Sequence, residues 1–217
     1  MESYQREFID LCIQNKILKF GNFTLKSGRK SPYFFNAGLF TSGSIMRQVG
    51  KAYATVLSAN NQQDRILFGP AYKGIPLVVA TAMALNLDFQ QDVQYSYNRK
   101  EVKDHGEGGQ LVGADINGKS VVVLDDVVTA GTAFRETMTQ LESNNASCSA
   151  LILALDRQEK GKSSVSTVQE LKDTYQVPVY SIITLADILK YLKEVDNPEL
   201  AQYSDQINQY RQQYSVA

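Results

Sequence analysis

The sequence predicts an α/β fold in which a doubly wound, mainly parallel central sheet is flanked by helices. Short apolar segments alternate with longer segments whose apolar residues recur at helical spacing. Residues 121–124 are apolar at every position, as expected for a strand buried on both faces of a parallel sheet. Parallel neighbours need crossover connections, and the helical segments supply them.

The individual elements follow from local periodicity and turn residues. An amphipathic helix is expected over residues 3–18, then strands at 22–26 and 32–36, then a helical face from Met46 to Leu57. A strand at 65–68 and an apolar helix at 74–87 begin the alternation. Further strands are expected at 93–97, 111–114, 119–124, 149–155 and 179–183, with a helix ending near Asn144 and surface helices after the last strand.

Asn117-Gly118 separates the strands at 111–114 and 119–124, and this dipeptide predicts that the two strands pair as a hairpin. Residues 113–120 also match the pattern of a nucleotide-binding P-loop. A P-loop opens a helix, whereas Lys119-Ser120 leads directly into an apolar strand. We therefore do not expect ATP to bind at this segment.

The composition excludes several classes of protein. The chain has 217 residues, 43% hydrophobic and 21% charged, which is ordinary for a soluble globular protein. A net charge of −1 gives no reason to expect nucleic acid or membrane as a partner. Cys12 and Cys148 lack metal-ligand spacing, and a single histidine makes a zinc site implausible. Because no signal peptide or membrane-spanning segment is apparent, a cytoplasmic protein is expected.

The strongest functional signal follows the buried strand at 121–124. Asp125 and Asp126 stand where the strand ends, and Thr129-Ala-Gly-Thr132 opens the next helix. In open α/β sheets ligands bind at this edge, and a helix-opening turn aims N–H groups at a phosphate. The carboxylates suit sugar hydroxyls, because like charges would repel a phosphate. The stretch therefore predicts a ribose-phosphate clamp, with a simple helix cap as the alternative.

Three other segments carry candidate site residues. Lys73, in the turn after the strand at 65–68, lies at the same sheet edge, although the alternative there is an ordinary turn. The charged, glycine-rich residues 99–109 predict a mobile loop that closes over a polyanion, with a solvated hairpin tip as the alternative. If residues 32–36 form a strand, Phe34 and Phe35 point to opposite faces, so one can join the core while the other, or its backbone, meets a planar ligand; the alternative is that both are core residues.

Residues 121–133 as a whole resemble the motif by which type I phosphoribosyltransferases bind 5-phospho-α-D-ribose 1-diphosphate (PRPP). The chain resembles the orotate phosphoribosyltransferase family in particular, and the matching segments occur in that family's order. Val128 stands where isoleucine is common, an aliphatic exchange of little consequence. The matching segments are residues 24–29, 31–36, 69–74, 97–100, 103–109, 124–133 and 156–157.

The resemblance implies transfer of ribose 5-phosphate from PRPP to orotate in pyrimidine (UMP) biosynthesis, giving orotidine 5′-monophosphate and diphosphate. It implies Mg²⁺ held mainly by PRPP and water, without direct protein ligands. Catalytic roles are implied for Lys103, His105, Asp125 and Asp126, and orotate contacts for Phe34, Phe35, Thr129 and Arg157. For Arg157 the alternative is a structural salt bridge. PRPP contacts are implied for Lys26, Tyr72, Lys73, Arg99, Lys100, Lys103, His105, Asp125, Asp126, Val127, Val128, Thr129, Ala130, Gly131, Thr132 and Ala133.

The resemblance also implies an assembly. A single phosphoribosyltransferase domain would span residues 1–217, with residues 1–40 contributing much of a cap over the active site. The protein would be a homodimer in which the loop at 99–110 reaches the neighbouring active site. Two alternatives stay open: a phosphoribosyltransferase for another base, and a PRPP-sensing regulator that binds nucleic acid. The regulator would need a basic face or an added DNA-binding domain, and neither is visible in the sequence.

Overall fold

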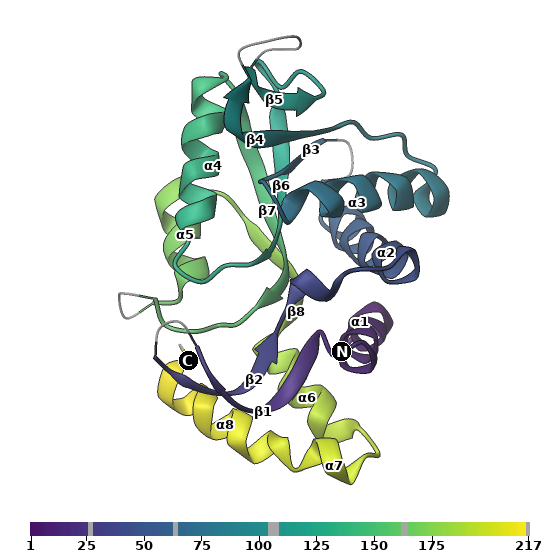
Figure 1. The fold of residues 1–217 in the computed structure, drawn as a ribbon, viewed down its shortest axis with the longest axis vertical. Helices are drawn as coiled ribbons and strands as arrows, with labels where there is room; N and C mark the ends of the chain where they lie inside the picture. The colour runs from purple at the N-terminus through teal and green to yellow at the C-terminus, as the bar shows by residue number, and fades with distance from the viewer. Residues whose placement is uncertain (26–27, 63–64, 104–108, 162–164, 216–217) are drawn as a thin grey trace.

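The computed structural model describes residues 1–25, 28–62, 65–103, 109–161 and 165–215, and for residues 102, 103 and 109 only the backbone. In this part of the chain a six-stranded sheet of order β5-β4-β3-β6-β7-β8 forms the centre, beside a two-stranded sheet of β1 and β2 (Figure 1). The strands are β1 Leu18–Thr24, β2 Lys30–Phe35, β3 Ile66–Gly69, β4 Tyr95–Lys103, β5 Gly109–Gly113, β6 Ser120–Val127, β7 Ser147–Asp156 and β8 Val179–Thr184. The helices are α1 Ser3–Gln14, the 3₁₀-helix η1 Ala37–Leu39, α2 Gly43–Ala59, α3 Gly74–Phe89, α4 Thr132–Ser143, α5 Thr167–Tyr175, α6 Leu185–Glu194, α7 Pro198–Ala201 and α8 Tyr203–Tyr214.

The sheet confirms the predicted doubly wound, mainly parallel fold. Strands β4, β3, β6, β7 and β8 run parallel, and only β5 pairs antiparallel, at the edge beside β4. Helices α2 and α3 lie on one side of the sheet, and α4 and α5 lie on the other (Figure 1). The carboxyl ends of the parallel strands therefore meet at one edge, as the sequence predicts.

The predicted hairpin between residues 111–114 and 119–124 is wrong. Asn117-Gly118 does form a turn, in which the Asn117 N–H donates to Asp115 Oδ1 at 3.0 Å and Gly118 has a φ of 67°. However, β5 pairs with β4, while β6 lies between β3 and β7. The reason is burial: β6 is apolar on both faces and needs a central position, whereas the half-exposed β5 is suited to the edge. Ser120 begins β6, so the absence of a P-loop helix after Lys119 is confirmed.

Other elements differ from expectation in extent or burial. The loop expected at 99–110 is shorter, because β4 continues to Lys103 and β5 begins at Gly109. Helix α5, between β7 and β8, is not among the elements predicted from the sequence. The final helices are more than surface elements, since Leu192 of α6, and Ile207 and Tyr210 of α8, are buried. None of the helices described is both long and apolar enough to cross a lipid bilayer.

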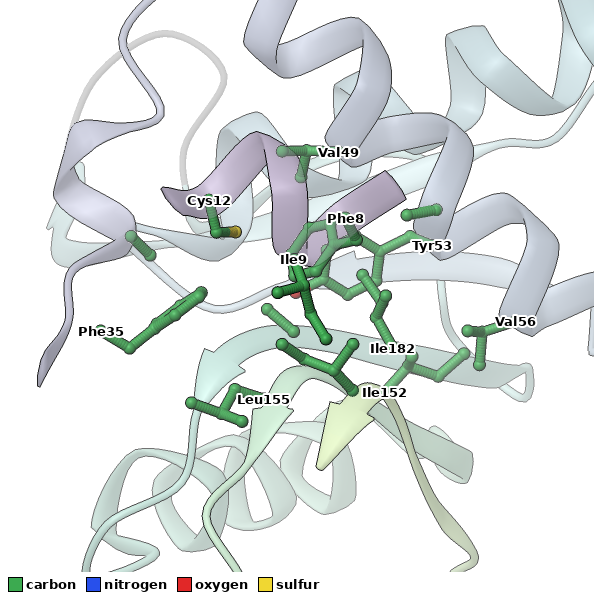
Figure 2. Close-up of a cluster of buried hydrophobic side chains, with 14 of the residues drawn as sticks. Phe8, Ile9, Cys12, Phe35, Val49, Tyr53, Val56, Ile152, Leu155 and Ile182 are labelled. Atoms are coloured by element: carbon green, nitrogen blue, oxygen red, sulfur yellow. The ribbon is translucent and has the colours of Figure 1, made fainter. Parts of the chain in front are cut away.

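Alternate side chains of β6 pack into two different hydrophobic clusters. Val122 and Leu124 belong to the apolar cluster shared with α1, α2 and α3, whereas Val121 and Val123 face the cluster of α4 and α5. In the first cluster, Ile9 of α1 packs among side chains of α2 and of the sheet (Figure 2). The amino-terminal helix is therefore continuous with the main core.

Truncation of this core should be costly. Ile152 of β7 is fully buried within the cluster of Figure 2, so Ile152→Ala should lower the free energy of unfolding by about 2–5 kcal/mol. Urea denaturation followed by circular dichroism measures the change. Leu87→Ala removes a 70% exposed side chain and serves as the control, with a change within about 0.5 kcal/mol. Equal effects of the two substitutions would contradict the assignment of this core.

Candidate functional site

The carboxyl ends of β3 and β6 bring two distant segments of the chain into direct contact. Lys73, at the start of α3, forms an ion pair with Asp126 at the end of β6, with Nζ 2.5 Å from Oδ2. Asp126 is 8% exposed, whereas the Lys73 side chain is 57% exposed. An exposed cation thus pairs with a nearly buried carboxylate, and the two predicted halves of the site form one unit.

The two adjacent carboxylates are held by their own backbone and by α2. The Asp126 N–H donates to Asp125 Oδ1 at 2.9 Å, and the Tyr53 hydroxyl donates to the Asp125 carbonyl oxygen at 2.7 Å. Burial raises the pKa of Asp125 to about 7, and the neighbouring charge of Asp126 acts in the same direction, while Lys73 partly opposes both. The two carboxylates therefore disfavour a further negative charge, and they favour hydroxyl donors or nearby positive charge.

The turn that follows β6 requires a glycine. Gly131 has a φ of 75°, and a Cβ atom there would lie 3.3 Å from Leu171 Cδ2 and 3.4 Å from Thr167 Cγ2 of α5. Thr167 also fixes the turn directly, since its hydroxyl donates to the Thr129 carbonyl oxygen at 2.8 Å. Helix α5 thus packs against one side of the turn, and the other side of the turn is exposed to solvent.

This turn presents the positive end of α4. Gly131 stands at the N-cap position and has no side chain with which to bond the first N–H groups of the helix. Thr129, Ala130, Thr132 and Ala133 are exposed around it. Free N–H groups at a helix start, beside threonine hydroxyls, are an arrangement that binds phosphate. The predicted clamp of carboxylates and phosphate turn is therefore contiguous in the structure.

The turn at 69–74 is compact because of its two glycines. A Cβ atom on Gly69 would lie 2.4 Å from the Gly74 carbonyl oxygen, so the strand and helix approach too closely for a side chain there. The Ala71 N–H donates to Asn98 Oδ1 of β4 at 2.8 Å. Asn98 was given no role from the sequence, yet it fixes the turn that carries Lys73.

Tyr72 and Lys100 are brought together on the exposed side of this turn. The Lys100 Nζ lies 5.0 Å from the centre of the Tyr72 ring, a cation–π contact between α3's entry turn and β4. Tyr72 is 67% exposed. A cavity of about 220 Å³ lies beside these residues, between η1 and the start of α3. It is lined by Ala37, Gly38, Phe40, Tyr72, Lys73, Pro76, Leu77 and Asp126.

Phe34 and Phe35 point to opposite faces of β2, as predicted. Phe34 is 38% exposed and stacks on Phe23, with ring centres 5.6 Å apart. Phe35 is buried and meets the edge of Phe40 at 6.2 Å. Of the two rings, Phe34 is therefore the more exposed.

Arg157 follows β7 at the same sheet edge and is already engaged in an ion pair. Its Nε and Nη2 donate to Glu159 Oε1 at 2.9 and 2.6 Å, and its guanidinium lies 4.9 Å from the centre of the Tyr33 ring. Burial alone would lower the pKa of Arg157, but Tyr33 and Glu159 raise it above the ordinary value. The structural salt bridge considered as an alternative is therefore present, and it holds a charged guanidinium.

Some predicted residues lie outside the described part of the chain. Lys26 and His105 belong to this group, and of Lys103 only the backbone, at the end of β4, is described. Residues that support the site were missing from the sequence analysis because no local motif marks them. Tyr53, Asn98 and Thr167 act across long sequence separations, whereas Glu159 lies only two residues from Arg157, without a motif that marks it.

Comparison with known proteins gives a consistent result. The family described as the phosphoribosyl transferase domain matches residues 39–180. Orotate phosphoribosyltransferase of Proteus mirabilis is 51% identical over 216 residues, covering 100% of both chains, and that of Shigella flexneri is 49% identical with the same coverage. The crystal structure of orotate phosphoribosyltransferase from Francisella tularensis superposes with a TM-score of 0.87 at 42% identity. That match covers 97% of this chain and 100% of the other.

The raised pKa of Asp125 predicts a pH-dependent stability effect. A carboxyl whose pKa is raised on folding stabilises the protein below the unfolded pKa of about 4, and this contribution is lost as pH rises toward 7. Asn does not titrate, so Asp125→Asn should stabilise the unliganded protein relative to wild type by at least about 1 kcal/mol more at pH 8 than at pH 4.5. Urea titrations at both pH values measure this. Asp88→Asn, at an exposed position of α3, is the control, and a pH-independent difference for Asp125→Asn would contradict the prediction.

Proposed function

The chain belongs to the orotate phosphoribosyltransferase family, and from this premise we propose that it transfers the ribose 5-phosphate group of PRPP to orotate. The products are orotidine 5′-monophosphate and diphosphate, as in pyrimidine biosynthesis. The observation that carries the proposal is the contact between Lys73 and Asp126, at 2.5 Å, beside the open start of α4. This contact places a carboxylate for the ribose hydroxyls, a turn for the phosphate and a cation for the leaving diphosphate at one edge of the sheet.

Different residues of the clamp bind different parts of PRPP. Asp125 and Asp126 accept hydrogen bonds from the ribose hydroxyls, and residues 129–133 bind the 5′-phosphate through N–H groups and hydroxyls. Each charge-assisted hydrogen bond of this kind contributes about 1.5–3 kcal/mol. The anomeric carbon becomes cationic as diphosphate leaves, and the adjacent carboxylates stabilise that charge.

Lys73 has two partners in this scheme. It pairs with Asp126 in the structure, and its largely exposed side chain can turn toward a diphosphate. The exchange releases Asp126 for the ribose hydroxyls and moves the positive charge to the leaving group. Tyr72, Arg99 and Lys100 lie on the same turn or on β4, and we assign them to the diphosphate as well, together with Lys26, Lys103 and His105.

We propose Mg²⁺ as the metal, held mainly by PRPP and water. No cluster of three or more His, Cys, Asp or Glu side chains occurs among the described residues, and Mg²⁺ in phosphate-transfer sites is commonly held by few carboxylates and many substrate oxygens. The oxygens of Asp125 and Asp126 fit an outer contact with such an ion. When bound, Mg²⁺ supplies charge neutralisation of the diphosphate.

For orotate we assign Phe34, Phe35, Thr129 and Arg157. Orotate is planar and carries a carboxylate, which an aromatic face and a guanidinium recognise. Phe34 offers its accessible ring, while Phe35, which is buried, anchors the strand that carries it. Arg157 is charged and fixed at the end of β7, the strand next to the clamp.

We further propose a homodimer in which residues 99–110 of each chain complete the neighbouring site. Strands β4 and β5 lie at the end of the molecule away from β1, β2 and α8 (Figure 1). Their position at the sheet edge supports a reach beyond the chain's own body.

The activity is tested by the loss of orotate absorbance in the presence of PRPP and Mg²⁺, beside parallel assays with adenine, hypoxanthine and uracil. We expect turnover with orotate alone, abolished by a chelator and restored by Mg²⁺. Turnover with another base would contradict the residues assigned to orotate, but the residues assigned to PRPP in the clamp would still stand. PRPP binding without turnover of any base would instead favour a regulator, for which a nucleic-acid binding assay is the next measurement.

The shared site is tested by mixing two inactive variants. Lys103→Ala removes a loop residue and Asp126→Asn removes a clamp residue, so each homodimer should be nearly inactive. After mixing and subunit exchange, a dimer with one chain of each kind has one intact site, and about a quarter of all sites should become active for random pairing. Either variant mixed with itself is the control. No recovery, despite subunit exchange shown by labelled chains, would contradict the shared site.

A further inference from the structure

The carboxyl-terminal helix α8 reaches the candidate orotate site through a buried tyrosine. Helix α8 lies across β1 and β2 (Figure 1), and Ile207 and Tyr210 are its buried residues. The Tyr210 hydroxyl donates to Glu159 Oε1 at 2.8 Å. Burial and the nearby charge of Glu159 raise the pKa of Tyr210 to about 12, so the hydroxyl remains a donor at physiological pH.

Glu159 joins several parts of the chain through one carboxylate. Besides Tyr210, its Oε1 accepts from Nε and Nη2 of Arg157 and from the Tyr33 hydroxyl of β2 at 3.2 Å. Its Oε2 lies 3.5 Å from Nη1 of Arg29, which stands before β2. The Glu159 side chain is 14% exposed, so these bonds form largely out of water and hold their partners in place.

This arrangement determines which edge of Arg157 is available. A guanidinium carries five N–H groups in one plane. Glu159 takes the Nε edge with one hydrogen of Nη2, and the Tyr33 ring covers one face of the plane. The remaining edge is formed by Nη1 and the second hydrogen of Nη2, and an edge of this kind binds a carboxylate with two parallel bonds.

The charges of the cluster also leave room for an anion. Arg157 and Arg29 together carry two positive charges, and Glu159 supplies one negative charge. One positive charge remains, which matches the single carboxylate of orotate.

The backbone reinforces the link between α8 and the segment after β7. Glu159 and Ser215 form an antiparallel bridge, and the Lys160 N–H donates to the Tyr214 carbonyl oxygen at 2.7 Å. Arg29 lies over the Tyr214 ring at 5.2 Å. The end of α8 is therefore tied to the residues that immediately follow Arg157.

We propose that Glu159 and Tyr210 are positioning residues for orotate: they fix Arg157 so that the edge formed by Nη1 and Nη2 faces the substrate carboxylate. Helix α8 thereby becomes part of the base-binding site. The inference rests on the proposed function, in which Arg157 binds orotate. Without Glu159 the guanidinium would lose the ion pair that fixes its orientation, and the cost of orienting it would weaken orotate binding without affecting PRPP.

The test is a comparison of Michaelis constants for orotate and PRPP across a set of variants. Glu159→Ala should raise the orotate KM about tenfold, and Glu159→Gln less, because the amide oxygen still accepts from Arg157. Tyr210→Phe should raise it roughly threefold through loss of one donor. The PRPP KM should stay within about twofold throughout. Tyr203→Phe, the same change on the same helix where the ring stacks on Phe20, should leave both constants unchanged.

Arg157→Ala distinguishes a failure of the positioning role of Glu159 and Tyr210 from a failure of the assignment of Arg157 to orotate. If it raises the orotate KM while Glu159→Ala and Tyr210→Phe do not, the positioning role is overturned and the proposed function stands. If Arg157→Ala leaves the orotate KM unchanged, the assignment of Arg157 fails first, and the inference fails with it. A lower orotate KM in Glu159→Ala would show that Glu159 only masks charge, which also overturns the proposal. Should Glu159→Ala not fold, Tyr210→Phe and Glu159→Gln decide by the same criteria.

Discussion

Burial of β6 on both faces is the constraint on which the rest of the site depends. Residues 121–124 are fully buried, with alternate side chains in two different apolar clusters. A strand of this kind is stable only in the middle of a sheet with helices on both sides. Its carboxyl end therefore lies between those of β3 and β7. Lys73, which follows β3, contacts Asp126 on one side, and β7, which precedes Arg157, lies on the other side.

The same burial raises the free-energy cost of ionising the acidic pair. Removal from water disfavours the ionised form of Asp125, and Asp126 adds a like charge beside it. The ion pair with Lys73 offsets part of this cost, and the Lys73 side chain stays 57% exposed. In the proposed function the ribose hydroxyls of PRPP donate to this acidic pair and its diphosphate attracts Lys73, so binding of PRPP offsets the same cost.

Precision at the sheet edge comes from elements that touch no substrate in the proposed mechanism. Thr167 of α5 holds the turn after β6, Asn98 of β4 holds the turn that carries Lys73, and Glu159 with Tyr210 of α8 holds Arg157. Each of these contacts reaches a loop from a neighbouring strand or helix. Because loops have little internal support, such contacts are what fixes functional groups in a reproducible geometry.

The sequence by itself determined the strands, most helices, the place of Asp125 and Asp126 at the end of β6 and the absence of a helix directly after Lys119, because apolar periodicity and turn residues act over a few neighbouring positions. It could not decide that β5 pairs with β4, since Asn117-Gly118 specifies a turn and not the partner of the strand that follows. Nor could it reveal α8 as a support for Arg157, because the polar sequence of that helix conceals one buried tyrosine. Those features depend on burial and hydrogen bonding between residues that are distant along the chain, and only the tertiary structure brings such residues together.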